Sequence, residues 1–108
     1  MRAVIVDDEK LARDELKFLL EENGDIEIVG EGENGFEALE LCRRLGPELL
    51  FLDIQMPGKN GIEAAREILD LINAPSILFQ TAYDEFALQA FEVHAVDYLL
   101  KPISPQRL

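Results

Sequence analysis

LLFLDIQMPGKNG, residues 49–61, is the stretch of this chain that decides its fold class. Four apolar residues, 49–52, end on the carboxylate of Asp53, and Pro57-Gly58 then breaks the chain. A continuous apolar run before a turn is typical of a parallel strand that helices cover on both faces. Because an isolated buried charge is costly, Asp53 either reaches the surface end of the strand or has a partner.

Apolar β-rich runs alternate with helical periodicity along the rest of the chain. The runs predict strands at residues 3–6, 26–29, 49–52, 76–80 and 96–100, and the periodic segments predict helices at about 9–23, 34–45, 61–73 and 86–91. This alternation is typical of parallel βαβ units with right-handed crossovers. We therefore expect one α/β domain over residues 1–108, a doubly wound sheet with helices on both faces.

Turn and capping residues set the expected helix ends. Asn23-Gly24 ends the first helix, and Asn34 with Glu37 resembles a capping box at the start of the second. The expected buried faces of the second and third helices carry Ala38, Leu39, Cys42 and Leu45, and Ile62, Ala65, Ile68, Leu69 and Ile72, respectively.

Composition excludes several classes of protein. The net charge of −12 argues against direct binding to nucleic acid, whose phosphates carry the same sign. No apolar run reaches the length of a membrane span, and the N-terminus lacks the form of a signal peptide. The single cysteine, Cys42, cannot form an internal disulfide, so we expect a cytoplasmic protein with Cys42 as a small core residue.

The last residues predict the start of a helix that the sequence does not complete. Ser104-Pro105 has the form of an N-cap followed by proline at the first helical position, but the sequence stops at Leu108. We therefore expect the chain to lack most of its C-terminal helix. The missing helix would leave apolar surface uncovered and favour association of two chains as a homodimer.

Polar residues stand at the carboxyl end of four predicted strands. Asp7, Asp8 and Glu9 follow the first, Asp53 the third, Thr81 the fourth and Lys101 the fifth. Functional groups collect at this edge of an open parallel sheet. Clustered carboxylates without His or Cys select a hard cation, and Mg²⁺ suits a small site with room for phosphate. A metal-bound carboxylate beside a hydroxyl and an amine is chemically suited to accept a phosphoryl group.

The order and spacing of four motifs resemble the receiver domains of two-component response regulators. The motifs are VDDE at 6–9, DIQMPGKNG at 53–61, TAY at 81–83 and DYLLKP at 97–102. The longer run TAYDEFALQAFEVHAVDYLLKP at 81–102 resembles receivers attached to LytTR-type DNA-binding domains. The resemblance implies a flavodoxin-like fold, a five-stranded parallel sheet of order 2-1-3-4-5.

The resemblance also assigns the metal and acceptor residues. Asp53 matches the aspartate that takes a phosphoryl group from a phosphohistidine of a sensor histidine kinase. Asp8 and Asp53 match direct Mg²⁺ ligands, Asp7 matches an acid that acts largely through water, and the backbone carbonyl of Gln55 matches a further ligand.

Three further residues match the switch of the family. Thr81 and Lys101 match the residues that contact the phosphoryl group, and Tyr98 matches the aromatic residue that turns inward when Thr81 moves. The side chains of Gln55 and Tyr83 flank the site and are expected to set the lifetime of the phosphoryl group. The Lys101-Pro102 bond is expected to be cis.

These assignments imply a signalling switch rather than a turnover enzyme. Its partners would be a sensor kinase and an output domain absent from this chain, which would bind DNA and regulate transcription. Taken alone, Asp7 and Asp8 also fit acids at a helix N-terminus, Lys101 a solvated lysine, and Tyr98 a core residue.

Two other classes of protein, a phosphatase and a flavin-binding protein, fit this sequence less well than a receiver domain, and His94 is a weaker candidate for a site residue. A phosphatase of the haloacid dehalogenase type needs a second acid two residues after its nucleophile, where this chain has Gln55. A flavin-binding flavodoxin needs a phosphate-binding loop after the first strand, where this chain has acids. His94 lies between an apolar helix and a strand, and we do not expect it to act as a phosphorelay histidine.

Overall fold

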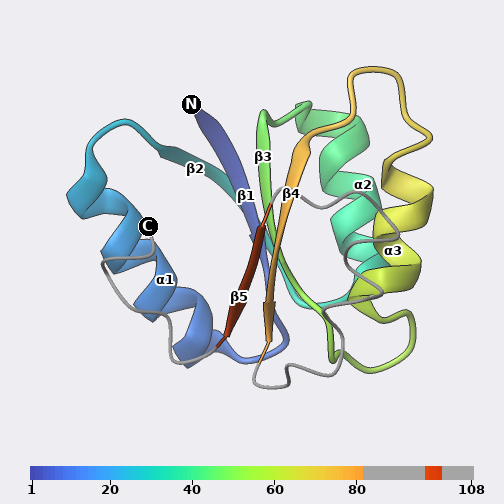
Figure 1. Cartoon of the computed structure of the whole chain (residues 1–108), viewed down its shortest axis with the longest axis horizontal. Coiled ribbons are helices and arrows are strands. Elements are labelled where there is room, and N and C mark those ends of the chain that lie inside the picture. Colours follow the sequence, from blue (N-terminus) through green and yellow to red (C-terminus); the bar gives the residue numbers. More distant parts are fainter. Residues whose placement is uncertain (82–96, 101–108) are drawn as a thin grey trace.

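The computed structural model describes residues 1–81 and 97–100, which form an α/β sandwich around a parallel sheet (Figure 1). The strands are β1 (Arg2–Val6), β2 (Glu27–Gly32), β3 (Leu49–Asp53), β4 (Ser76–Thr81) and β5 (Asp97–Leu100); the helices are α1 (Lys10–Asn23), α2 (Gly35–Leu45) and α3 (Gly61–Ile68). All paired strands are parallel, in the order β2-β1-β3-β4-β5. The predicted fold class and strand order are confirmed.

Helices cover both faces of the sheet, as the continuous apolar strands predicted. Figure 1 shows α1 on one face and α2 and α3 on the other. Alternate residues of β1 serve the two faces: Ala3 and Ile5 join the core beneath α1, whereas Val4 and Val6 join the core beneath α2 and α3. All four are fully buried, so β1 has no solvent-facing side beyond its first residue.

The capping residues act largely as predicted. Gly24 and Gly46 end α1 and α2 in the left-handed conformation, at φ 81° and 55°. The Asn34 side chain accepts a hydrogen bond from the Glu37 N–H at 2.9 Å, but the Glu37 carboxylate accepts from Glu33 N–H instead of completing the capping box. A complete capping box forms at the start of α3, where no such prediction was made, between Asn60 and Glu63.

The third helix ends at Ile68, five residues before the predicted end at residue 73. After Leu69, the N–H groups of Asp70 and Leu71 donate to carbonyls three residues back instead of four. The tighter turn rotates the chain off the helical register. Ile72 is consequently 91% exposed, and its prediction as a buried residue was wrong, whereas Ile68 is fully buried.

The second strand was predicted too short, and one buried residue of α2 was missed. The strand runs to Gly32 because β1 pairs with it as far as Val6, with an irregularity in register between Ala3 and Val4. The apolar pattern stops before Glu31. A charged residue is tolerated there because β2 is an edge strand and is half exposed. Leu41 is buried against β2, in contact distance of a Cβ built on Gly30.

Several predictions fall outside the described residues. These are the helix at 86–91, the residues Tyr83, His94 and Lys101, the Lys101-Pro102 bond and the start of the last helix at Ser104. The backbone of Tyr98 lies in β5, paired with Phe79 of β4. In the part of the chain that the structure describes, no helix has the length and apolar character needed to cross a membrane.

Gly61 is the position where the packing of α3 tolerates least change. A Cβ at this residue would lie 2.2 Å from the backbone oxygen of Asp53 and 2.9 Å from Cα of Ile54. We predict that Gly61→Ala lowers the free energy of unfolding by about 2 kcal/mol or more, because both neighbours are backbone atoms that cannot move aside. Urea unfolding measures the loss. Gly24→Ala, with open space around its Cβ, is the control and should lose about 1 kcal/mol from its left-handed backbone alone; equal stability of Gly61→Ala and wild type would contradict the packing.

Cys42 is the buried core residue that the sequence predicted, and burial raises the pKa of its thiol to about 11. At about pH 8, only about one thiol in a thousand would be ionised, and the thiolate is the reactive form. We predict that iodoacetamide alkylates Cys42 slowly in the folded protein and rapidly in guanidinium chloride. Mass spectrometry follows both reactions. Rapid alkylation without denaturant would show that the thiol is accessible and ionised.

Candidate functional site

The carboxyl ends of β1 and β3 place two acids beside each other. The two strands are paired in parallel with Val6 opposite Leu52, so the next residues along, Asp7 and Asp53, stand side by side. Asp7 is fully buried and Asp53 is 4% exposed, whereas Asp8 is exposed. Asp53 is therefore a buried acid at a strand tip and has a neighbour of the same charge.

Asp7, Asp8 and Asp53 form one acidic cluster. One carboxylate oxygen from each residue lies within 4.8 Å of those of the other two. The structure thus brings together three of the four acids that the strand-end argument selected. Glu9, which follows them in sequence, is outside this cluster and uses its backbone N–H to donate to Asp7 Oδ1 at 3.0 Å.

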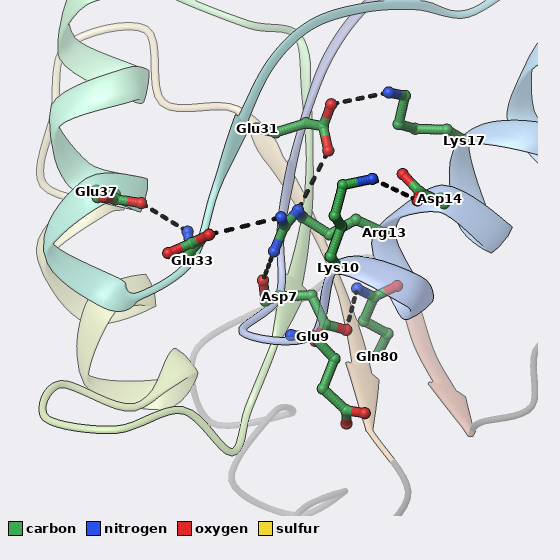
Figure 2. A network of polar contacts seen from close by, with 10 residues as sticks. All are labelled: Asp7, Glu9, Lys10, Arg13, Asp14, Lys17, Glu31, Glu33, Glu37 and Gln80. Carbon is green, nitrogen blue, oxygen red and sulfur yellow. Dashed lines mark hydrogen bonds and ion pairs between the residues drawn. The ribbon is translucent and has the colours of Figure 1, made fainter.

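The backbone and side chain of Asp7 are held from several directions (Figure 2). Its N–H donates to the carbonyl of Gly32 on β2, and its carbonyl accepts a 2.6 Å hydrogen bond from Arg13 Nη1 on α1. Its second carboxylate oxygen, Oδ2, accepts from Gln80 Nε2 on β4 at 3.3 Å. Residues from two other strands and one helix thus converge on Asp7.

Arg13 connects Asp7 to the acids of β2 and the following loop. Its side chain is 9% exposed and forms ion pairs with Glu31 at 3.2 Å and Glu33 at 3.6 Å, and Lys17 pairs with Glu31 at 2.9 Å (Figure 2). The hydrogen bond from Lys17, supported by the charges of Lys17 and Arg13, lowers the pKa of Glu31. Glu31 therefore stays ionised in the folded protein and balances the positive charge beside Asp7.

A hollow of about 400 Å³ opens next to the acidic cluster and shares Asp8 with it. Its other walls come from the loop after β3, residues 54–58 and Asn60. The loop is pinned at its end, where Gly61 N–H donates to the Ile54 carbonyl at 2.8 Å. Gln55 lies on this wall and is exposed.

The α2 helix supports the same loop from outside. Gly35 approaches Lys59 so closely that an added Cβ would lie 2.6 Å from the Lys59 carbonyl oxygen. Lys59 forms an ion pair with Glu67 and lies 5.1 Å from the centre of the Phe36 ring, a cation–π distance. These contacts attach the loop to α2 and α3.

Thr81 is at the end of β4, where it is 1% exposed. It lies on the strand next to β3, one residue after the partner of Asp53 in the β3–β4 register, which is Gln80. The structure therefore brings Thr81 to the same sheet edge as the acidic cluster. Lys101 and the side chain of Tyr98 lie outside the described residues.

The donor set fits a hard divalent cation. Three carboxylates offer oxygen ligands only, within reach of one ion, and an open hollow beside them leaves room for water and phosphate oxygens. This combination matches the preference of Mg²⁺, which keeps several waters and uses one or two carboxylates. Without a cation, the same three acids repel one another at short range.

Two residues of the site were not predicted from the sequence. Arg13 stands three and seven positions before Leu16 and Leu20, which share the buried face of α1, and that spacing was the available signal for a buried arginine. Gln80 carries a weaker signal, a polar residue inside an otherwise apolar strand. Their shared partner, Asp7, is shown only by the tertiary structure.

Comparison with known proteins shows which family this chain resembles in sequence. A family model described as response regulator receiver domain matches residues 3–108. The chain is 49% identical over all its 108 residues to the sensory transduction protein LytT of Bacillus cereus, and 52% identical to the transcriptional regulatory protein BtsR of Escherichia coli K12. It spans 44% and 45% of these two relatives, less than half the length of each.

The fold comparison agrees with the sequence comparison. The crystal structure of the response regulatory domain of protein mrkE from Klebsiella pneumoniae superimposes with a TM-score of 0.92 at 38% identity. The match covers 99% of this chain and 88% of that one. The similarity therefore extends over the sheet, its helices and the edge that carries the acidic cluster.

The repulsion within the cluster predicts opposite effects of Asp8→Asn with and without a cation. Without divalent ions, removing one charge should raise the free energy of unfolding by about 1 kcal/mol. With Mg²⁺ at about one hundred times its Kd, wild type should gain about 2.7 kcal/mol, and Asp8→Asn should gain less because one ligand is lost. Thermal unfolding with Mg²⁺ or EDTA measures both effects.

The matched control for this experiment is Asp25→Asn, which removes an exposed acid before β2 at the opposite edge of the sheet. It should leave the stabilisation by Mg²⁺ unchanged. Equal stabilisation of wild type and Asp8→Asn by Mg²⁺ would exclude Asp8 as a ligand.

Proposed function

This chain belongs to the family of response regulator receiver domains, and we propose that it is a phosphorylation-controlled switch with Asp53 as its phosphoacceptor. The observation that carries the proposal is the cluster of Asp7, Asp8 and Asp53 at adjoining strand tips. Asp53 is the member of the cluster that ends β3, directly before the loop that lines the hollow. An incoming phosphoryl group would therefore meet its carboxylate at the carboxyl edge of the sheet.

The proposed reaction is transfer of a phosphoryl group from a phosphohistidine of a sensor histidine kinase. A carboxylate oxygen of Asp53 attacks phosphorus, and the bond from phosphorus to the histidine nitrogen breaks. The nitrogen keeps the electron pair, and the ring leaves as neutral imidazole because the other ring nitrogen of the phosphohistidine carries a proton. Asp53 can act as the nucleophile because a carboxylate is ionised at neutral pH and needs no base. The pinned loop at 54–58 holds the acceptor backbone in place during the attack.

Asp8 and Asp53, with the backbone carbonyl of Gln55, are the residues that would hold Mg²⁺ directly, and Asp7 would act through water. When bound, Mg²⁺ would neutralise negative charge that develops on the transferring group. Support for this assignment comes from the oxygen-only donor set and from the position of Gln55 on the wall of the hollow that Asp8 lines.

The proposed switch begins at Thr81. Its hydroxyl donates a hydrogen bond to the phosphoryl group, Lys101 offsets the new charge, and Tyr98 turns toward the space that Thr81 leaves. A phosphoryl group supplies both negative charge and acceptor oxygens for such contacts. The position of Thr81 at the end of β4, next to β3, supports the first of these steps. The side chains of Gln55 and Tyr83 would set how long the phosphoryl group survives.

The chain would act as a regulator rather than a turnover enzyme, with chemistry limited to gaining and losing its own phosphoryl group. We propose that the complete protein joins this receiver, residues 1–108, to an output domain of the LytTR type that binds DNA. The relatives named above support this, since they are more than twice as long and carry names of transcriptional and sensory regulators. A cytoplasmic location and a homodimer are part of the same proposal.

Incubation with acetyl phosphate and Mg²⁺ tests the phosphoacceptor. We predict that intact-mass spectrometry detects one acid-stable, base-labile phosphoryl adduct and that peptide mapping places it on Asp53. EDTA should prevent the adduct, since the acids would repel phosphate without a cation. The adduct should be absent from Asp53→Asn and present in Asp70→Asn, which changes an exposed acid after α3. An adduct that persists in Asp53→Asn would contradict the proposal.

A further inference from the structure

We propose that Gln80 is a positioning residue of the metal site, whose side-chain amide holds the Asp7 carboxylate in the orientation that Mg²⁺ binding requires. The inference rests on the proposed function, which identifies the cation as Mg²⁺. It adds a residue on β4 that belongs to none of the motifs at 6–9, 53–61, 81–83 and 97–102.

The sheet places Gln80 in line with two acids of the cluster. β1, β3 and β4 are consecutive strands, and Gln80 is the register partner of Asp53 on β3. Its side chain spans the width of β3 and reaches Asp7 at the end of β1, where Nε2 lies 3.3 Å from Oδ2 (Figure 2). Gln80 is 1% exposed and Asp7 is fully buried, so water does not screen this contact.

The chemistry of the amide determines which of its ends faces Asp7. A carboxylate is stabilised by the NH₂ group and would be repelled by the amide oxygen, so the contact orients the Gln80 side chain. The other end of the amide, Oε1, is buried without a hydrogen-bond donor among the described residues. A buried acceptor without a donor typically costs about 1–3 kcal/mol. The side chain is therefore placed for its contact with Asp7 rather than for complete pairing of its own polar atoms.

The consequence for the cation site lies in the two oxygens of Asp7. Oδ1 accepts from the Glu9 N–H at 3.0 Å, and Oδ2 accepts from Gln80 at 3.3 Å, so two donors from different segments define the plane of the carboxylate. A carboxylate oxygen has two lone pairs, so an oxygen that accepts one of these hydrogen bonds is also able to accept one from a metal-bound water. Without the Gln80 amide, repulsion from Asp8 and Asp53 would favour rotation of Asp7 away from the cluster.

Mg²⁺ affinity separates this role from a structural role in β4. Gln80→Met keeps the length and removes the donor, whereas Gln80→Asn keeps the amide but cannot reach Asp7. Outer contacts that orient metal ligands typically change metal affinity by about tenfold or more, so we expect both variants to raise the Mg²⁺ Kd about tenfold. Isothermal titration calorimetry on the intact chain, at a temperature where every variant is folded, measures the Kd.

Ile77→Val is the matched control, because Ile77 is a buried residue of β4 that packs in the core beneath α2 and α3, on the face opposite Gln80. It should lower stability and leave the Kd for Mg²⁺ unchanged. If the Kd rises equally in Ile77→Val and Gln80→Met, then stability alone accounts for the effect and the inference is wrong. If Gln80→Met and Gln80→Asn bind Mg²⁺ within about twofold of wild type, it is also wrong.

A double-mutant cycle tests the contact itself without a metal. In EDTA, the changes in unfolding midpoint of Gln80→Met and Asp7→Ala should be non-additive, because each variant removes the same hydrogen bond. Additive changes would show that the two side chains do not interact and would overturn the inference. If wild type binds no Mg²⁺, the proposed function fails as well; if wild type binds Mg²⁺ and only the Gln80 predictions fail, the proposed function stands.

Discussion

Parallel pairing of β1 with β3 is the constraint on which the rest of this structure depends. Once Val6 is opposite Leu52, the ladder leaves Asp7 and Asp53 no position except beside each other at the same edge. Two buried carboxylates at that distance oppose folding, and the apolar strands behind them supply the free energy that holds them there. This electrostatic cost falls at the edge of the sheet where a bound cation would lower it.

The surroundings of the cluster limit that cost. Arg13 donates to the Asp7 carbonyl, and the acids of β2 balance its charge. Glu9 and Gln80 donate to the Asp7 carboxylate. Because these contacts come from α1, β4 and the backbone after β1, the orientation of one acid depends on three separate segments. A site that binds and releases a ligand needs such contacts, because they keep the ligating side chains oriented when the ligand is absent.

Sequence reasoning succeeded where a local pattern has only one spatial outcome. Apolar runs that end on Asp7 and Asp53 predicted neighbouring acids, because parallel strands share the direction in which their carboxyl ends point. It was less successful where tertiary contacts override the pattern. Ile72 continues the apolar periodicity of α3 but is exposed, since the backbone changes to tighter turns after Leu69. The second strand was predicted to end at Val29, yet its pairing with β1 continues through Glu31, which also pairs with Arg13.

The sequence by itself determined the fold class, the strand order through the family resemblance, and the acids and hydroxyl of the candidate site, because alternation and strand-end residues are properties of the linear chain. Only the tertiary structure decided which side chains contact these acids. Gln80 and Asp7 are separated by 73 positions and by a whole strand, and Arg13 meets Asp7 from a helix. Such partnerships arise from the register of three strands and the packing of α1, and no local periodicity encodes them.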